Sequence, residues 1–355
     1  MRILALNSSP RRGGQSRTEM MLNCLVEGMR DAGAEVEIVN LHEKTVNNCM
    51  GCFTCWTKTP GKCIHKDDMT KELFPKWLAS DLAVYATPLY HYTVNAEMKA
   101  FIERTLPVLE PFFEQQDNRT VHPLRQAPPD AVVLSVAGFI EMSVFDQISN
   151  YVNFLFGRHM RLLAEIYRPA AEALASIKDK KEDVFEATFQ AGRELVTSRS
   201  VLTETLDRIQ QPITDFQTFS QIGNLYWKTC IAEGVTPKEF QEKNMIPRPD
   251  SLETFMLLFP FGINVGVIGD RKVYLQFIFS GEETDSCYFI IESGNVDAKE
   301  GKKKSPDITI ETPFEIWMDI MTGKADGQQI FMEQKYRVDG DLSLMMQLLQ
   351  REKGN

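Results

Sequence analysis

The chain has 355 residues, of which 43% are hydrophobic and 25% charged, and its net charge at pH 7 is −10. This length exceeds what one hydrophobic core usually supports and predicts two domains, while the acidic balance excludes the basic surface that nucleic-acid binding needs. The first apolar run, residues 3–6, is too short for a signal peptide, and no apolar run reaches the ~20 residues of a membrane span, so we expect a cytoplasmic protein.

Strands and helices alternate through the first half of the chain. Short apolar runs predict five strands, over residues 2–6, 36–39, 82–87, 131–136 and 163–167. Apolar residues at helical spacing predict helices between them, over residues 20–33, 69–80, 96–105 and 145–156. Asp67 and Asp68 precede the second helix, as capping residues do. This alternation predicts a parallel sheet with right-handed crossovers.

The pattern changes after about residue 170. Residues 178–210 and 216–232 have helical spacing with no strand between them. Alternating apolar runs then predict strands over residues 265–268, 273–279, 287–291 and 307–310, followed by helices over 314–321 and 342–349. We expect an antiparallel sheet here. The predicted organisation is an α/β domain over residues 1–172, a helical connector over 173–245 and a small α+β domain over 246–355.

A polar loop, residues 7–18, leaves the first predicted strand and enters the first helix. Backbone N–H groups at a helix start point outward with the positive end of the helix dipole, which suits a phosphate. The hydroxyls of Ser9, Ser16 and Thr18 can donate to it, and Arg11 or Arg17 can neutralise it. The loop has no G-x-G-x-x-G motif. The alternative is a serine-rich turn that only caps the helix.

Two further loops follow later strands of the same predicted sheet. Residues 87–95 follow the third strand, and residues 138–141 follow the fourth. Ligands of open parallel sheets bind outside the carboxyl ends of the strands, so Tyr90 and Tyr92 can hold a flat ring there. The alternative is that both tyrosines pack against the helix that follows them.

The chain resembles the flavodoxin-like NADPH-dependent FMN reductase family, especially its iron–sulfur flavoprotein branch. The resemblance rests on the two loops at residues 7–18 and 87–95, on residues 98–101 and on the stretch 49–69. The resemblance covers residues 1–168 and implies a flavodoxin-like doubly wound sheet that binds FMN. It implies phosphate contacts from Ser9, Arg11, Gln15, Ser16 and Thr18. It implies ring contacts from Pro88, Leu89, Tyr90, Tyr92 and Thr93, with Gly138 in the third loop. Two departures are Gln15, where many members have Asn, and Asn7-Ser8, where Gly-Ser is more usual.

Four of the seven cysteines, Cys49, Cys52, Cys55 and Cys63, lie in one loop after the second strand. A turning backbone brings such closely spaced sulfurs together, so they can bind one metal centre. In a reducing compartment they are metal ligands or redox thiols more often than disulfides. Their spacing matches that of the iron–sulfur flavoproteins, which implies a 4Fe-4S cluster; zinc and free thiols are the alternatives. Cys24, Cys230 and Cys287 are expected to be buried packing residues.

Residues 255–349 resemble the sterol carrier protein type 2 family. The resemblance rests on residues 273–277, 306–310, 316–317, 323–327 and 336–341. It implies an apolar tunnel between a curved sheet and its helices, and hence an apolar ligand; the alternative is a solid core without a ligand. Gln334 stands where the family usually has glycine.

The function predicted from these features is an FMN-dependent oxidoreductase that takes electrons from NADH, NADPH or ferredoxin. The flavin supplies the redox chemistry, so no acid–base dyad is required and no catalytic residue is assigned; His91 is the one histidine to test as a proton donor. The alternative is a lipid-binding or hydrophobic-ligand-binding protein with a redox-sensing flavodoxin-like domain. The resemblance also implies a homodimer. The physiological acceptor, the electron donor and the oligomeric state stay open.

Overall fold

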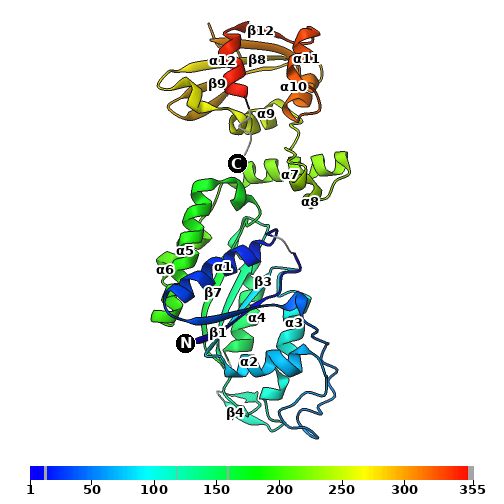
Figure 1. Cartoon of the computed structure of the whole chain (residues 1–355), viewed down its shortest axis with the longest axis vertical. Coiled ribbons are helices and arrows are strands. Elements are labelled where there is room, and N and C mark those ends of the chain that lie inside the picture. Colours follow the sequence, from blue (N-terminus) through cyan, green and yellow to red (C-terminus); the bar gives the residue numbers. More distant parts are fainter. Residues whose placement is uncertain (12–13, 117, 158–159, 351–355) are drawn as a thin grey trace. The chain divides into compact units, whose positions relative to one another are not determined.

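The computed structural model describes residues 1–11, 14–116, 118–157 and 160–350, which form two compact units, Met1–Ile213 and Thr214–Asn355. Each unit contains its own five-stranded sheet (Figure 1). Within the described residues, no helix has both the length and the apolar character needed to cross a bilayer. The cytoplasmic location and the domain boundaries after residues 172 and 245 stay predictions.

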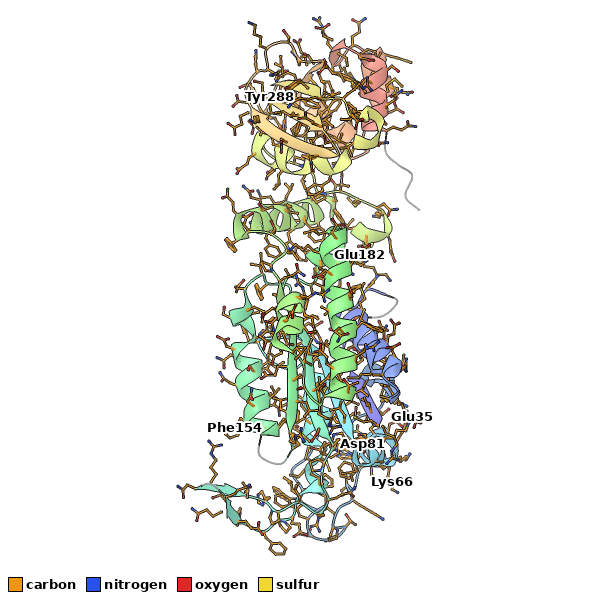
Figure 2. All side chains as sticks on the ribbon, turned by 90° about the vertical axis from the view of Figure 1, so that its left-hand side faces the viewer. Glu35, Lys66, Asp81, Phe154, Glu182 and Tyr288 are labelled. Carbon is orange, nitrogen blue, oxygen red and sulfur yellow. The ribbon has the colours of Figure 1, made fainter. Side chains whose placement is uncertain are left out.

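The sheet of the first unit is entirely parallel. Its strands are β1 (Arg2–Asn7), β2 (Glu35–Asn40), β3 (Leu82–Pro88), β6 (Asp130–Val136) and β7 (Leu162–Arg168). Their spatial order, β2-β1-β3-β6-β7, is that of the flavodoxin-like doubly wound fold and confirms the predicted fold class. The amino ends of β2 and β3 meet at one edge of the sheet, near Glu35 and Asp81 (Figure 2). The carboxyl ends therefore share the opposite edge.

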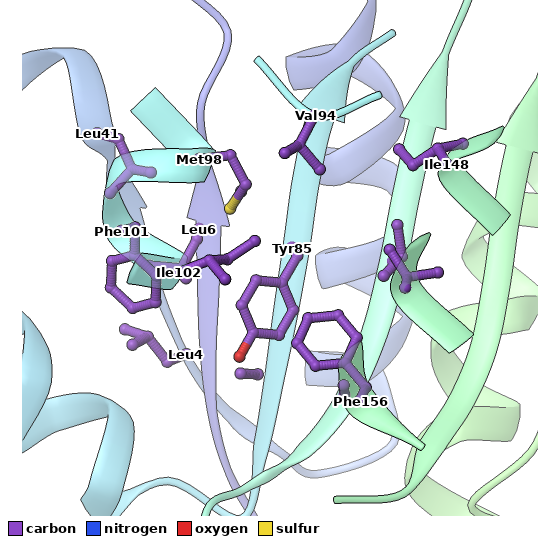
Figure 3. Close-up of a cluster of buried hydrophobic side chains, with 14 of the residues drawn as sticks. Leu4, Leu6, Leu41, Tyr85, Val94, Met98, Phe101, Ile102, Ile148 and Phe156 are labelled. Atoms are coloured by element: carbon purple, nitrogen blue, oxygen red, sulfur yellow. The ribbon is translucent and has the colours of Figure 1, made fainter. Parts of the chain in front are cut away.

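Helices cover both faces of this sheet, which is why its strands are apolar on both sides. The helices of the first unit are α1 (Arg17–Asp31), α2 (Phe74–Ala79), α3 (Ala96–Glu103), α4 (Asp146–Phe156), α5 (Lys178–Thr197) and α6 (Thr203–Gln210). One face packs against α2, α3 and α4: Figure 3 shows Leu4, Leu6 and Tyr85 of the sheet among Phe101 of α3 and Phe156 of α4. The opposite face packs against α1.

Smaller elements connect these helices and strands. A short hairpin, β4 (Glu114–Gln116) and β5 (Arg119–Val121), follows α3, and Met69–Leu73 forms a π-helical turn before α2. Short 3-10 helices occupy Leu41–Glu43, Leu106–Val108, Met142–Phe145 and Ala173–Ser176. The predicted helix over residues 69–80 is therefore two joined helical segments.

Helices α1 and α5 pack with their backbones in close approach. A Cβ added at Gly28 of α1 would lie 1.8 Å from the carbonyl oxygen of Phe189, and one added at Gly192 of α5 would lie 2.1 Å from that of Leu25. Both neighbours are backbone atoms and cannot turn away. The two glycines therefore set the distance between α1, which carries the polar loop at its start, and α5.

The second unit has a mixed sheet in the order β10-β9-β8-β11-β12. Its strands are β8 (Val273–Ser280), β9 (Ser286–Glu292), β10 (Asn295–Glu300), β11 (Ile308–Pro313) and β12 (Arg337–Gly340). The prediction of an antiparallel sheet is wrong for one pairing, because β11 runs parallel to β8. The chain passes from β10 back across the sheet before it enters β11, so β11 runs in the same direction as β8. The alternation of apolar and polar residues along a strand does not show in which direction that strand runs.

Helices of the second unit are α7 (Phe216–Glu233), α8 (Pro237–Glu242), α9 (Leu252–Leu258), α10 (Phe314–Met321), α11 (Gly327–Met332) and α12 (Leu342–Leu349), with a 3-10 helix at Phe259–Gly262. The strand predicted over residues 265–268 is wrong: Val265–Ile268 is a 3-10 helix. The Asn264 side chain accepts a hydrogen bond from the Gly266 N–H at 3.2 Å and so starts a tight turn instead of an extended strand.

Aromatic rings fill the core between this sheet and its helices. Phe255 of α9 contacts Phe277 and Phe289 edge-on, with ring centroids 5.1 and 5.8 Å apart, and Trp317 of α10 lies 5.0 Å from Phe277. Edge-to-face contacts of this kind favour a close-packed interior. Gln334 adopts the left-handed conformation, with φ 57°, so the turn after α11 forms without glycine.

We expect Gly28→Ala to lower the free energy of unfolding of the first unit by about 1–3 kcal/mol or more, because the new methyl group must push α5 away from α1. Chemical denaturation followed by circular dichroism measures the change. The matched control is Gly223→Ala in α7, where a Cβ meets nothing within 4 Å. That change should stabilise its helix by ~1 kcal/mol. A neutral effect of Gly28→Ala would contradict the close helix contact.

Candidate functional site

The carboxyl ends of the parallel strands form one edge of the first sheet. Asn7 at the end of β1 pairs with Asn40 of β2 and Ala86 of β3, and Val136 of β6 pairs with Pro88 of β3. The loops that follow β1, β3 and β6 therefore leave the sheet side by side. These are the three loops predicted to hold a phosphate and a flat ring.

A buried hydrogen-bond network joins the first two loops. The Asn95 side chain donates to the Ser8 carbonyl at 2.6 Å, and the Asn95 backbone N–H donates to the Thr87 hydroxyl at 3.2 Å. The Ser8 N–H donates in turn to the Ala86 carbonyl at 3.0 Å. Asn7 is also buried, and its side chain donates to Asn40. We did not assign Asn7, Thr87 or Asn95 a site role from the sequence. The only sequence feature that pointed to one of them was the predicted helix that starts directly after Asn95.

The hydroxyl groups of the first loop are buried at the start of α1. Ser16 caps the helix: its Oγ accepts from the Glu19 N–H at 3.0 Å. A hydroxyl that accepts one bond still has a proton to donate, so Ser16 and its buried neighbours Ser9 and Thr18 remain able to bind an anion. Gln15 lies beside them, partly exposed. Residues 12 and 13 of this loop lie outside the described residues.

One carboxylate, Glu172, pairs with both arginines of the loop. Arg17 Nε lies 3.1 Å from Glu172 Oε2, and Arg11 forms a second ion pair with the other oxygen. Arg11 and Glu172 are each half-exposed, so the pair can exchange for another anion. Glu172 follows β7, more than 150 residues from the arginines, and spacing in the sequence offered no signal for it.

The loop after β3 contains a tight turn in an uncommon backbone conformation. His91 and Tyr92 have φ angles of 47° and 65°, and Tyr90 and Thr93 exchange two backbone hydrogen bonds of 3.1 Å across them. Positive φ at both central residues defines a type I′ turn, which costs about 1–3 kcal/mol per residue without glycine. Tyr90 and Tyr92 are 43% and 50% exposed, so neither ring is buried against α3. Strain of this kind is often retained at binding sites.

An aromatic platform forms where the second and third loops meet. The rings of Tyr92 and Phe139 lie nearly parallel, 8° apart in orientation, with centroids separated by 6.3 Å. Gly138 precedes Phe139, and the Leu89 N–H donates to the Val136 carbonyl at 2.9 Å, which joins the loops. We did not single out Phe139 from the sequence, although it follows Gly138 directly. Pro88, a buried residue, is the last residue of β3.

The four clustered cysteines line one small hollow of about 20 Å³, together with Arg104 at the end of α3. We call it the cysteine hollow. Within the part of the chain that the structure describes, no group of three or more His, Cys, Asp or Glu residues is arranged to hold a metal ion. The thiols are therefore gathered in one place, in an arrangement that does not by itself coordinate a metal.

The thiols of the cysteine hollow differ in acidity. Hydrogen bonds from the Thr54 hydroxyl and backbone lower the pKa of the exposed Cys52 thiol. Burial, followed by the charge of Cys63, raises the pKa of Cys55. The thiolate form is therefore favoured at Cys52 and disfavoured at Cys55.

A buried ion pair holds both ends of the cysteine loop. The Arg104 guanidinium binds Asp67 through two hydrogen bonds of 2.7 and 3.0 Å, and both side chains are at most 2% exposed. Arg104 also donates to the Asn47 carbonyl at 2.6 Å and the Thr70 hydroxyl at 2.9 Å. Burial alone would raise the pKa of Asp67, but hydrogen bonds from Arg104, Asn47 and Thr70 outweigh it and hold this pKa below its usual value.

The helix cap predicted from Asp67 and Asp68 is only half right. Asp67 does accept from the Thr70 N–H, at 3.1 Å, as a capping residue would. Asp68 makes no capping bond and instead accepts from the Thr45 N–H at 2.7 Å. Its role is to hold the segment before the cysteine loop against the segment after it.

Comparisons with known proteins agree with these two units. Residues 1–125 match the NADPH-dependent FMN reductase family, and residues 272–350 match the SCP-2 sterol transfer family. Both predicted resemblances are therefore confirmed.

Similar curated proteins are iron–sulfur flavoproteins of archaea. One from Archaeoglobus fulgidus is 38% identical over a segment that covers 30% of this chain and 46% of the relative. One from Methanocaldococcus jannaschii is 31% identical over a segment that covers 31% of this chain and 52% of the relative. The chain thus spans about half the length of the curated relatives it matches. A similar solved structure is an NAD(P)H:quinone oxidoreductase from Methanothermobacter marburgensis, with 17% identity, a TM-score of 0.44, and coverage of 55% of this chain and 96% of that chain.

We expect Asp67→Asn to lower the free energy of unfolding of the first unit by about 3–5 kcal/mol at pH 7, because it leaves the buried Arg104 charge unpaired. The pKa of Asp67 in the folded protein lies below its usual value of 3.8. The ionised Asp67 therefore contributes its full stabilisation to the folded state above pH 3.8, and this contribution is lost as the pH falls below 3.8. The difference in the free energy of unfolding between the wild type and Asp67→Asn should therefore become smaller below about pH 4. Denaturation between pH 2 and 7 measures it. The matched control is Asp68→Asn, and equal losses from both variants would contradict the role of the ion pair.

Proposed function

We propose, from the match of residues 1–125 to the NADPH-dependent FMN reductase family, that the first unit binds FMN and that the chain is an NAD(P)H-dependent oxidoreductase. One observation carries the proposal: a helix start rich in donors and an exposed aromatic platform lie on the same edge of a parallel sheet. That combination suits a ligand with an anionic tail and a flat ring. The electron donor is a nicotinamide or a ferredoxin, as the sequence predicts.

The proposed phosphate contacts are the backbone at the start of α1, the hydroxyls of Ser9, Ser16 and Thr18, the Gln15 amide and Arg11. Because Glu172 already pairs with Arg11 and Arg17, a phosphate would compete with this carboxylate for both guanidinium groups. Phosphate carries more charge than a carboxylate and has more acceptor oxygens. Binding would therefore release Glu172 to solvent and anchor the loop on the ligand.

The proposed ring contacts are the residues of the second and third loops, Pro88, Leu89, Tyr90, Tyr92, Thr93 and Gly138. FMN, when bound, supplies both one-electron and two-electron chemistry. The protein orients the ring, and the strained turn at His91 and Tyr92 presents two tyrosines to it without a rearrangement on binding. No acid–base dyad is needed, and His91, at the tip of the turn, remains the histidine to test as a proton donor.

We further propose that the cysteine hollow binds an iron–sulfur cluster that exchanges electrons with the flavin. Two observations support this: the curated relatives are named iron–sulfur flavoproteins, and the four cysteines line one hollow together with the buried Arg104. A cluster held by four thiolates is negatively charged, which a neighbouring guanidinium stabilises. The thiols must move closer together to bind it, since the described arrangement holds no metal. Zinc and free redox thiols are the competing outcomes.

A second candidate function is the binding of an apolar ligand by the second unit, which the match to the SCP-2 sterol transfer family favours. The aromatic rings of this unit pack in contact with one another, so a ligand would have to displace them. Mass spectrometry of lipids that co-purify with the full chain tests this function. We also propose a homodimer, which light scattering of the FMN-loaded protein tests.

We expect Arg11→Gln to weaken FMN binding ~10-fold or more, because a charge-assisted hydrogen bond contributes about 1.5–3 kcal/mol. Riboflavin, which has no phosphate, should bind wild type and variant equally well. Calorimetric titration with both ligands measures the difference. Lys71→Gln, at an exposed position near the cysteine loop, is the control and should change neither affinity. Failure of the wild type to bind FMN would overturn the proposal.

We expect protein purified without oxygen to contain about four iron atoms and four sulfides per chain, and Cys52→Ser to lose most of both. Cys52 is exposed, so the variant should fold. Cys24→Ser, in α1, is the matched control and should keep the iron. Stoichiometric FMN together with zinc, or with no metal at all, would contradict the cluster.

A further inference from the structure

Arg104 has one N–H group that its buried ion pair leaves unused. A guanidinium has five N–H donors. The two on Nη1 bind Asp67 and the Asn47 carbonyl, and the two on Nη2 bind Asp67 and the Thr70 hydroxyl. The fifth, on Nε, is buried and has no hydrogen-bond partner among the described residues. A buried donor without a partner is costly, so its presence in a folded protein calls for an explanation.

A second donor of this kind belongs to the cysteine hollow. His65, two residues after Cys63, lines the hollow together with Arg104 and the four cysteines. Its side chain is partly exposed, but its Nε2 is buried and also lacks a hydrogen-bond partner within the part of the chain that the structure describes. An imidazole with its proton on Nε2 donates from that atom. Two residues with an unused nitrogen donor therefore line the same hollow as four cysteines.

The charges around the hollow favour a negatively charged sulfur group. Burial would lower the pKa of Arg104, but its hydrogen bonds to Asp67 and the charge of the Cys63 thiolate raise it, so the sulfur of Cys63 acts directly on this guanidinium. Of the described residues that line the hollow, only Glu103 is a carboxylate, and it is paired with Lys99. Four hydrogen bonds hold the guanidinium in place, so its charge is fixed beside the thiols.

We infer that Arg104 and His65 raise the reduction potential of the iron–sulfur cluster through N–H···S hydrogen bonds from Nε and Nε2. The inference rests on the proposed function, because it requires a cluster in the cysteine hollow. A cluster that accepts one electron gains one negative charge, so hydrogen-bond donors and a positive charge beside it stabilise its reduced form more than its oxidised form. Both residues therefore make the cluster easier to reduce, and neither is an iron ligand.

Potentiometric titration of the FMN-loaded chain, purified without oxygen, measures this potential independently of turnover, with electron paramagnetic resonance of the reduced cluster as the signal. We expect His65→Leu to make the cluster about tenfold harder to reduce, because it removes one hydrogen bond to a charged group; this corresponds to a midpoint potential lower by ~59 mV. His65→Gln should retain most of the wild-type potential, because its amide N–H can replace the Nε2 donor.

The matched control is His122→Leu, which should leave the potential unchanged. His122 is not among the described residues that line the hollow, and its Nδ1 lies 2.8 Å from the Phe112 carbonyl oxygen. It therefore removes an imidazole without removing a donor from the hollow.

Arg104 is changed together with its ion-pair partner, because removal of either one alone leaves the other charge buried and unpaired. The double variant Arg104→Gln, Asp67→Asn keeps the net charge of the chain, and we expect it also to lower the midpoint potential by ~59 mV. If the double variant does not fold, the two His65 variants decide the question.

A wild-type or higher potential in a variant that still contains its iron would overturn the role of the residue changed and would leave the cluster itself in place. Loss of the iron from His65→Leu would mark His65 as a ligand and likewise overturn the inference. A wild type purified without oxygen that contains no iron would overturn the cluster and the inference together.

Discussion

Parallel pairing of five strands is the constraint on which the candidate site depends. Parallel strands place their carboxyl ends on one edge, and the order β2-β1-β3-β6-β7 puts the start of α1 beside the loops after β3 and β6. The polar loop, the tyrosine turn and the segment with Glu172 meet there although they are far apart in the chain. The buried bonds of Asn95 to Ser8 and Thr87 then hold the first two loops in register.

The cysteine loop is held by electrostatics rather than by secondary structure. Residues 44–67 contain no helix or strand, so their order depends on contacts at their ends. The pair of Asp67 and Arg104 supplies these contacts, because one guanidinium binds the carbonyl before the loop and the side chains after it. The same arginine lines the cysteine hollow. Folding of the loop and the charge beside its thiols are therefore linked through one residue.

The sequence was informative where a feature is local. Strand and helix periods follow from neighbouring residues, so all five strands of the first sheet were predicted, as was the helix start at Ala96. The first helix starts at Arg17, three residues before the predicted start at residue 20, because Ser16 caps it. The second unit shows the limit: Asn264 turned a predicted strand into a 3-10 helix, and the polar strand β10 (Asn295–Glu300) was missed because an exposed edge strand lacks the apolar alternation of a buried one.

By itself, the sequence determined the class of the first fold, the polar loop, the tyrosine-containing loop after the third strand and the grouping of four cysteines, because each depends on residues close together in the chain. Tertiary structure alone decided which charges meet. Glu172 reaches Arg11 and Arg17, Arg104 reaches Asp67, and Arg168 is buried beside Arg17. Ion pairs and hollows form between segments that the sheet brings together, and residue spacing does not encode such distant contacts.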